Sequence, residues 1–263
     1  MLSINDINKS FITDIGTVKK VFQNLSLKIE NGDFVSVIGS NGAGKSTLLD
    51  SIAGNLTLDS GSIDIDGMEI TNIPRHKRGG FISKVYQNPS SGTAPSMTVF
   101  ENLSMADNKG KRFGFSSGLN RKRKEYYKQI LGELGLGMEN QLDTEVGALS
   151  GGQRQCLALI MATLNSPDIL LLDEHTAALD PGTSKIIMEK TKDIVEKNRI
   201  LTLMITHNLQ DAIKYGNRLI MLHNGSVIFD IKGEDKKKLT TEKLLKIFNN
   251  RDLYLKDSDL FSA

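Results

Sequence analysis

The segment Gly39–Ser46, GSNGAGKS, is the part of the sequence whose residue types and spacing point most directly to chemistry. It fits the pattern G-x-x-x-x-G-K-[ST], with an apolar run before it at Phe34–Ile38 and a helical pattern after it at Lys45–Ala53. Its glycines let the backbone curl with the amides facing inward, toward phosphate oxygens. A glycine-rich turn before a helix is the plain alternative, but strand, loop and helix in this order favour a nucleoside triphosphate site. The residues expected to bind it are Gly39, Ser40, Asn41, Gly42, Ala43, Gly44, Lys45, Ser46 and Thr47.

A pair of acids, Asp173-Glu174, supplies groups for hydrolysis of that triphosphate. The pair follows the apolar run Ile169–Leu172, and a buried strand delivers such groups to the sheet edge where ligands bind. We expect Lys45 to place a charge between the β- and γ-phosphates, and Ser46 and Asp173 to hold Mg²⁺. Glu174 is then expected to orient and deprotonate a water in line with the γ-phosphate. The alternative is that two acids merely end a strand.

Two further polar residues, Gln87 and His207, also follow buried-strand candidates, at Phe81–Tyr86 and Ile200–Ile205. A neutral imidazole beside the γ-phosphate donates one hydrogen bond. A glutamine there ligates Mg²⁺ and reports the nucleotide state to the segment that follows it. A lone histidine at a strand end is more often structural, so each residue is undecided when taken singly, and together they favour catalytic roles.

The segment 149–155, LSGGQRQ, is a second candidate anion site. Adjacent glycines are unfavourable inside a helix, but the start of a helix with unpaired backbone amides favours an anion. One chain with one phosphate loop has no evident need of a second such site.

Composition restricts the class of protein. The chain has 263 residues, 39% hydrophobic and 24% charged, with a net charge of +2, so no global field attracts nucleic acid or a membrane. Three basic clusters, Arg75–Arg78, Lys109–Arg112 and Arg121–Lys124, are read as solvated loops, with a lipid or nucleic-acid surface as the alternative. The single cysteine, Cys156, excludes an internal disulfide, fits a reducing compartment and is expected to be buried filler. The absence of a long apolar run or a signal peptide predicts a soluble intracellular chain.

Strand and helix patterns alternate along the chain, which predicts an α/β fold with a largely parallel central sheet. The first 70 residues are expected to form short strands, with a hairpin turn at Asp66-Gly67, and a second hairpin is expected at Asn224-Gly225. Residues 88–150 are expected to be a helical insertion. The further helices are expected at Thr98–Ala106, Lys122–Leu134, Pro181–Lys197 and Thr241–Asn249.

The motifs occur in an order that resembles an ABC-transporter ATP-binding subunit: the phosphate loop, Gln87, LSGGQRQ, ILLLDE, Ala178-Leu179-Asp180 and His207. The resemblance covers residues 1 to about 230, and LSGGQ is the family's signature. It implies a P-loop NTPase (RecA-like) core at 1–87 and 151–230, with an N-terminal antiparallel β subdomain. It also implies an inserted α-helical subdomain at 88–150, with 231–263 as a short C-terminal helix and tail.

The resemblance implies a reason for the second anion site. Two such subunits dimerise head to tail in the family, and the signature of one caps the ATP held by the other. Ser150, Gly151, Gly152 and Gln153 are then expected to contact the partner's ATP. Asp180 is expected to cross the dimer while also starting a helix with Pro181. Phe11 is expected to stack on adenine, with a core position as the alternative.

Transport partners also follow from the resemblance. We expect a second copy of the chain, separate integral-membrane permease subunits docked at Asn88–Glu101 and, indirectly, a substrate-binding protein, with no nucleic acid. The chain would then lie at the cytoplasmic face of the cell membrane. The stretches MTVFENLSMADN and LLLDEHTAALDP resemble ATPases of tryptophan/tyrosine-type importers. His175 in place of the family's usual proline, and Leu159 in place of a common arginine, suggest a subgroup. A cytosolic ABC-type ATPase acting on ribosomes or DNA, and an exporter motor, are the alternatives.

Overall fold

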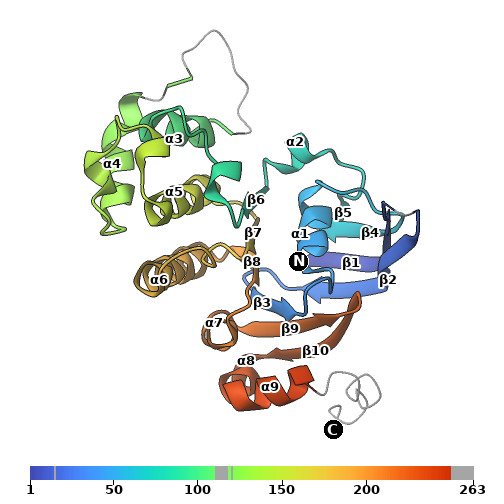
Figure 1. Ribbon diagram of the computed structural model, residues 1–263. Coiled ribbons are helices and arrows are strands. Elements are labelled where there is room, and N and C mark those ends of the chain that lie inside the picture. The colour runs from blue at the N-terminus through green and yellow to red at the C-terminus, as the bar shows by residue number, and fades with distance from the viewer. Residues whose placement is uncertain (15, 110–117, 120, 250–263) are drawn as a thin grey trace. The chain divides into compact units, whose positions relative to one another are not determined.

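The computed structural model describes residues 1–14, 16–109, 118–119 and 121–249 (Figure 1). The chain forms two compact units, one made of Met1–Arg78 with Arg199–Ala263 and the other of Gly79–Asn198. The polar tail from residue 250 and most of the cluster Lys109–Arg112 lie outside the described residues. Among the described residues, no helix combines the length and the apolar character needed to cross a membrane.

The first unit contains a four-stranded antiparallel sheet in the order β2-β1-β4-β5. Its strands are β1 (Leu2–Ile12), β2 (Val18–Ile29), β4 (Ser60–Ile65) and β5 (Met68–Glu69). The predicted hairpin turn is confirmed, because Asp66 and Gly67 both have positive φ, 49° and 83°, as a type I′ turn requires. The expectation of short strands was wrong for β1 and β2, which span 11 and 12 residues. β1 pairs with both β2 and β4, and β2 lies beside the phosphate loop, where Phe22 approaches Gly44.

A second group of strands in this unit pairs in the order β10-β9-β3-β8. The strands are β3 (Phe34–Gly39), β8 (Leu201–Ile205), β9 (Arg218–His223) and β10 (Ser226–Lys232). β3 is parallel to β8 and β9, whereas β10 is antiparallel to β9 across the predicted Asn224-Gly225 turn. Every residue of β3 is buried, as its continuous apolar run predicts for a central parallel strand.

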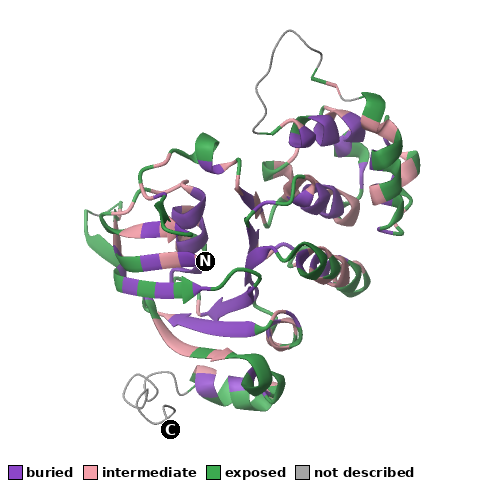
Figure 2. Cartoon of the chain, turned by 180° about the vertical axis from the view of Figure 1, so that it is seen from behind, coloured by how far each residue is buried: buried purple, intermediate pink, exposed green. Residues whose placement is uncertain are grey.

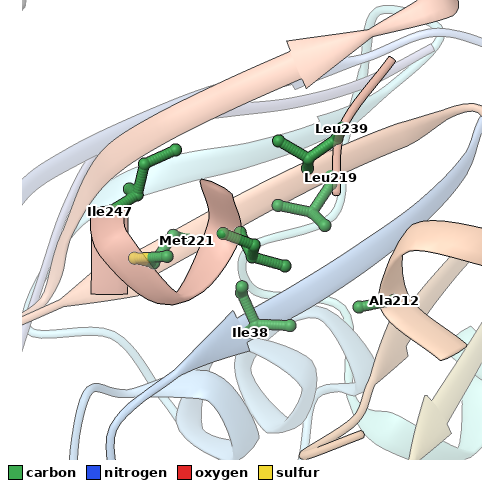
Figure 3. Packing of buried hydrophobic residues seen from close by; sticks show 7 residues of the cluster. Ile38, Ala212, Leu219, Met221, Leu239 and Ile247 are labelled. Carbon is green, nitrogen blue, oxygen red and sulfur yellow. The ribbon is translucent and has the colours of Figure 1, made fainter. Parts of the chain in front are cut away.

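Five helices complete the described part of this unit: α1 (Lys45–Ala53), α2 (Arg75–Arg78), α7 (Leu209–Lys214), α8 (Gly233–Lys237) and α9 (Thr241–Asn249). α1 and α9 have the bounds that the sequence predicts. An apolar cluster fixes α7 and α9 against the sheet, and it joins Ile38 of β3, Ala212 of α7, Leu219 and Met221 of β9, and Leu239, Leu244 and Ile247 near the C-terminus (Figure 3). The core that includes Ile38, the residue before the phosphate loop, therefore also includes side chains from residues 239–247.

The second unit pairs β6 (Ile82–Val85) in parallel with β7 (Ile169–Asp173). Its α-helices in the described residues are α3 (Val99–Asp107), α4 (Lys124–Gly132), α5 (Gly151–Thr163) and α6 (Pro181–Asn198). α3 begins with a capping box in which Thr98 and Glu101 satisfy each other's backbone amides. In this unit buried residues occupy most of β6 and β7 and one side of the helices, while the opposite sides of the helices are exposed (Figure 2).

The basic clusters are not all solvated. Arg78 is 3% exposed, and its guanidinium donates hydrogen bonds to the carbonyl oxygens of Ser51, Ile52, Thr71 and Ile73. Ser51 and Ile52 lie in the last turn of α1, where helix carbonyls have no partner within the helix. The expectation of a solvated loop was therefore wrong for Arg78, which holds the end of the helix that follows the phosphate loop.

Candidate functional site

The phosphate loop leaves the end of β3 and enters α1 through three glycines with positive φ, at Gly39, Gly42 and Gly44. Two of them also lack room for a side chain. A Cβ on Gly39 would lie 2.2 Å from the carbonyl oxygen of Leu222, and one on Gly44 would lie 2.6 Å from Phe22 Cε1. The glycine spacing that defines the motif is therefore required by backbone conformation and by close approach.

The loop forms a cradle that fits a chain of phosphates. Lys45 is buried, and its ammonium donates to the carbonyl oxygens of Gly39 at 2.8 Å and Ser40 at 3.0 Å. Gly44 is the N-cap of α1, and no side chain caps the amides of the first turn, which also contains no acidic residue. The start of a helix, where backbone amides point outward beside a buried ammonium, is an anion site.

His207 is placed by the same sheet. β8 is parallel to β3 with Val37 opposite Ile205, so both strands end at one edge. The phosphate loop begins two residues after Val37, and His207 follows two residues after Ile205. Asn208 holds the connection by accepting hydrogen bonds from the amides of Gln210 and Asp211, which begin α7. The prediction that this strand lies beside the loop strand is confirmed for β3 and β8, and His207 is exposed at that edge.

In the second unit, Asp173 is the last residue of β7 and Glu174 follows it. Asp173 forms an ion pair with Lys84 of β6, with Nζ 3.0 Å from Oδ2, and the side chains are only 6% and 16% exposed for Lys84 and Asp173. Glu174 has a φ of 48°, an uncommon conformation for a residue other than glycine. Such strain is retained where the surrounding structure imposes it, and it is frequent at functional residues.

Gln87 lies two residues after the end of β6 and is exposed. The residue before it is fixed by the signature helix, because Gln155 of α5, buried to 1% exposure, donates through Nε2 to the carbonyl oxygen of Tyr86 at 3.2 Å. The residue after it, Asn88, caps the short helix η1 (Pro89–Ser91). Sequence reasoning assigned no role to Lys84 or Gln155. Lys84 lies inside a predicted buried strand, between Ser83 and Val85, and that was the available signal that its charge needs a partner.

The signature segment forms the start of α5, as predicted. Ser150 is its N-cap and forms a capping box with Gln153, with Gln153 N–H donating to Ser150 Oγ at 3.2 Å and Ser150 N–H donating to Gln153 Oε1 at 3.1 Å. The two glycines between them have different surroundings. A Cβ on Gly152 would lie 2.4 Å from Thr183 Cγ2 of α6, whereas one on Gly151 would meet only Leu179 Cδ2, at 4.0 Å. Gly152 is therefore needed for packing, and Gly151 leaves an open backbone surface.

Two further predicted residues have clear local positions. Asp180 Oδ1 accepts a hydrogen bond from the amide of Thr183 at 2.9 Å, so its predicted role as helix cap is confirmed, and this bond lowers the pKa of its carboxyl. Phe11 near the end of β1 is 37% exposed, and Lys9 Nζ lies 5.2 Å from the ring centroid. Phe11 is therefore not a core residue, which leaves the stacking prediction standing.

The residues that mark a departure from the family are buried. His175 is 2% exposed, its Nε2 lies 3.3 Å from Thr191 Oγ1, and burial lowers its pKa to about 4. Leu159 is fully buried in α5. Cys156 is buried in the same helix, as predicted, and burial raises the pKa of its thiol to about 12.

The donor types fit a magnesium nucleotide. The expected ligands, Ser46, Gln87 and Asp173, offer a hydroxyl, an amide and a carboxylate oxygen, which are hard oxygen donors. Among the described residues no three His, Cys, Asp or Glu side chains gather into a metal cluster. Mg²⁺ held by one carboxylate and by phosphate oxygens needs no such cluster.

A phosphate loop on a parallel strand, acids ending a second parallel strand and a capped signature helix define an ATP-binding cassette. The ABC transporter family matches residues 22–177. The chain belongs to this family, as an ATP-binding subunit and ATPase, and the predicted fold class, an α/β cassette with an antiparallel β subdomain, is confirmed.

Relatives and solved structures agree with this assignment. The chain is 51% identical over 248 residues to the tyrosine transport ATP-binding protein of Clostridioides difficile strain R20291, covering 94% of this chain and 98% of that one. It is 32% identical over 240 residues to a phosphonates import ATP-binding protein of Oceanobacillus iheyensis, covering 88% and 89%. A solved ATP-binding cassette, a dimer in a post-hydrolysis state bound to ADP and Pi, is similar with a TM-score of 0.76 and 28% identity, covering 88% of this chain and 98% of that one.

Proposed function

We propose that this chain is the ATP-hydrolysing motor of an importer for an aromatic amino acid, with tyrosine as the first cargo to test. The observation that carries the cargo is the 51% identity to a tyrosine transport ATP-binding protein along 98% of that protein's length. The phosphate cradle around Lys45 supports the motor role. A cytosolic ABC-type ATPase or an exporter has no comparable support, since the relatives named above are transport or import subunits.

Within this function each site residue takes a defined role. Residues 39–47 bind the phosphates of ATP and Phe11 stacks on its adenine. Mg²⁺, when bound, screens the phosphate charge and polarises the γ-phosphate. Glu174 takes the proton of the attacking water, and His207 donates a hydrogen bond to the γ-phosphate. The magnesium ligands are Ser46, Gln87 and Asp173.

The working unit in this proposal is a head-to-tail homodimer. The solved relative in a dimeric post-hydrolysis state supports dimerisation. Ser150, Gly151, Gly152 and Gln153 then cover the partner's ATP, with the open backbone at Gly151 as the approach surface, and Asp180 makes the dimer contact. The Ser150 hydroxyl accepts the capping bond and still has its own proton to donate.

The permease is proposed to dock on the helical subdomain at 88–150, chiefly at Asn88–Glu101. This segment begins beside Gln87 and is tied to the signature helix through the bond from Gln155 to Tyr86. A docked helix would therefore respond to the nucleotide state. The chain is placed as a peripheral subunit on the cytoplasmic face of the membrane, with a substrate-binding protein reached only through the permease.

Uptake of labelled tyrosine in the host tests the cargo. Deletion of the gene is expected to abolish uptake, wild-type copies to restore it and Glu174→Gln copies to fail. Unchanged uptake of tyrosine and tryptophan after deletion would contradict the cargo while leaving the ATPase assignment intact.

A further inference from the structure

Strand β2 runs alongside the phosphate loop and contacts it at two glycines. A Cβ placed on Gly44 would lie 2.6 Å from Phe22 Cε1 and 3.1 Å from Val21 Cγ1. A Cβ placed on Gly42 would lie 3.7 Å from Lys19 Nζ. The ammonium of Lys19 thus lies against the exposed part of the loop, on a strand that is itself packed on the loop.

The register of the β1–β2 hairpin explains this position. Lys19 is paired with Phe11 in the antiparallel ladder, so their side chains stand on one face of the sheet. Lys20 is the next residue and points to the opposite face. Lys19 is exposed, and among the described residues neither an ion pair nor a side-chain hydrogen bond engages its ammonium. Lys9, by contrast, is held by Asp59 at 3.3 Å.

We propose that Lys19 is a second lysine of the nucleotide site, whose ammonium contacts the phosphate chain of ATP beside Gly42, in addition to the buried Lys45. The inference rests on the proposed binding of ATP by this loop. Phe11 and Lys19 together would place the base and the phosphates of ATP on one hairpin. The adenine base would stack on the Phe11 ring, and the Lys19 ammonium would lie between that ring and the phosphate loop. An ammonium attracts phosphates in proportion to their charge, so Lys19 favours triphosphate over monophosphate.

Competition binding to the full chain, with a fluorescent ATP analogue as the displaced probe, tests this role. Lys19→Met is expected to weaken ATP binding about tenfold, the size of a lost hydrogen bond to a charged group at an exposed site. The loss is expected to be smaller for ADP and smallest for AMP, and to shrink at high salt because the contact is screened. Lys19→Arg keeps the charge and is expected to stay within about threefold of wild type.

Lys20→Met is the matched control, since it removes the same charge one residue away on the other face. It is expected to bind ATP, ADP and AMP as wild type does. An equal loss in Lys20→Met, or no loss in Lys19→Met, would overturn the proposal. Equal losses for ATP, ADP and AMP would also overturn it, since the contact would then be to ribose or base. Lys45→Ala separates a failure of the Lys19 proposal from a failure of the proposed function. If wild type and Lys45→Ala both fail to bind ATP, the result contradicts the proposed function and not the role of Lys19.

Discussion

The two adjacent glycines of the signature helix should respond oppositely to the same substitution. Alanine in place of glycine in a helix stabilises by up to about 1 kcal/mol, less near the helix start. At Gly151 the new methyl meets nothing closer than 4.0 Å, so Gly151→Ala is expected to raise the free energy of unfolding by at most about 1 kcal/mol. At Gly152 the methyl would lie 2.4 Å from Thr183 Cγ2, and overpacking of this kind destabilises by about 1–3 kcal/mol.

Urea unfolding of both full-length variants, followed by circular dichroism, measures the difference. We expect Gly152→Ala to be less stable than Gly151→Ala by about 2 kcal/mol. The double variant Gly152→Ala with Thr183→Ser is the control. It removes Cγ2 and leaves Thr183 Cβ and Oγ1 at 3.6 and 3.7 Å, ordinary contact distances, so stability should return. A Gly152→Ala variant at least as stable as wild type would refute the packing argument.

Three further outcomes follow from the site and its surroundings. Lys84→Met leaves the largely buried carboxylate of Asp173 without this partner, so the free energy of unfolding measured by urea titration is expected to fall by about 2 kcal/mol. Lys84→Arg is the control. An unchanged free energy of unfolding in Lys84→Met would show that the pair adds no stability. Burial lowers the pKa of Lys236 to about 8, below its value of 10.5 in the unfolded chain, so between these pH values the unfolded chain binds more protons than the folded one. The free energy of unfolding, relative to that of Lys236→Met, is therefore expected to rise from about pH 8 to 10.5. Parallel pH profiles of the two proteins would contradict this. Glu174→Gln is expected to keep ATP binding and lose at least about a hundredfold in ATPase rate, whereas a wild-type rate would exclude Glu174 as the base.

The sequence predicted most of the elements because their signals are local. The bounds of α1 and α9 and both I′ hairpin turns follow from periodicity and from Asp-Gly and Asn-Gly pairs, and each is present. The loop strand β3 was predicted by its apolar run and by the glycine that ends it. The lengths of β1 and β2 were not predicted, because polar residues on their exposed faces interrupt the apolar pattern.

Residues whose role depends on distant partners were missed. Arg78 was grouped with a solvated basic cluster, yet two of its carbonyl partners, Ser51 and Ile52, lie 27 and 26 residues earlier. Gln155 donates a hydrogen bond to a carbonyl oxygen 69 residues before it. Lys19 lies beside the phosphate loop only because of the register of the sheet. Such contacts have no spacing signature in a single sequence. The motif residues were found because the chemistry of phosphate binding fixes their types and spacing.

A mixture of two defective subunits, Gly151→Asp and Lys45→Ala, tests whether the signature of one subunit acts on the ATP of the other. Each alone is expected to lack ATPase activity, the first because a carboxylate in the signature repels the partner's γ-phosphate, the second because its loop cannot hold ATP. In the mixed dimer one composite site pairs an intact loop with an intact signature, so ATPase activity is expected to reappear on mixing. A linked dimer with one wild-type site serves as the positive control. If that control hydrolyses ATP and the mixture never does, the signature does not act on the partner's nucleotide, and the head-to-tail dimer is contradicted.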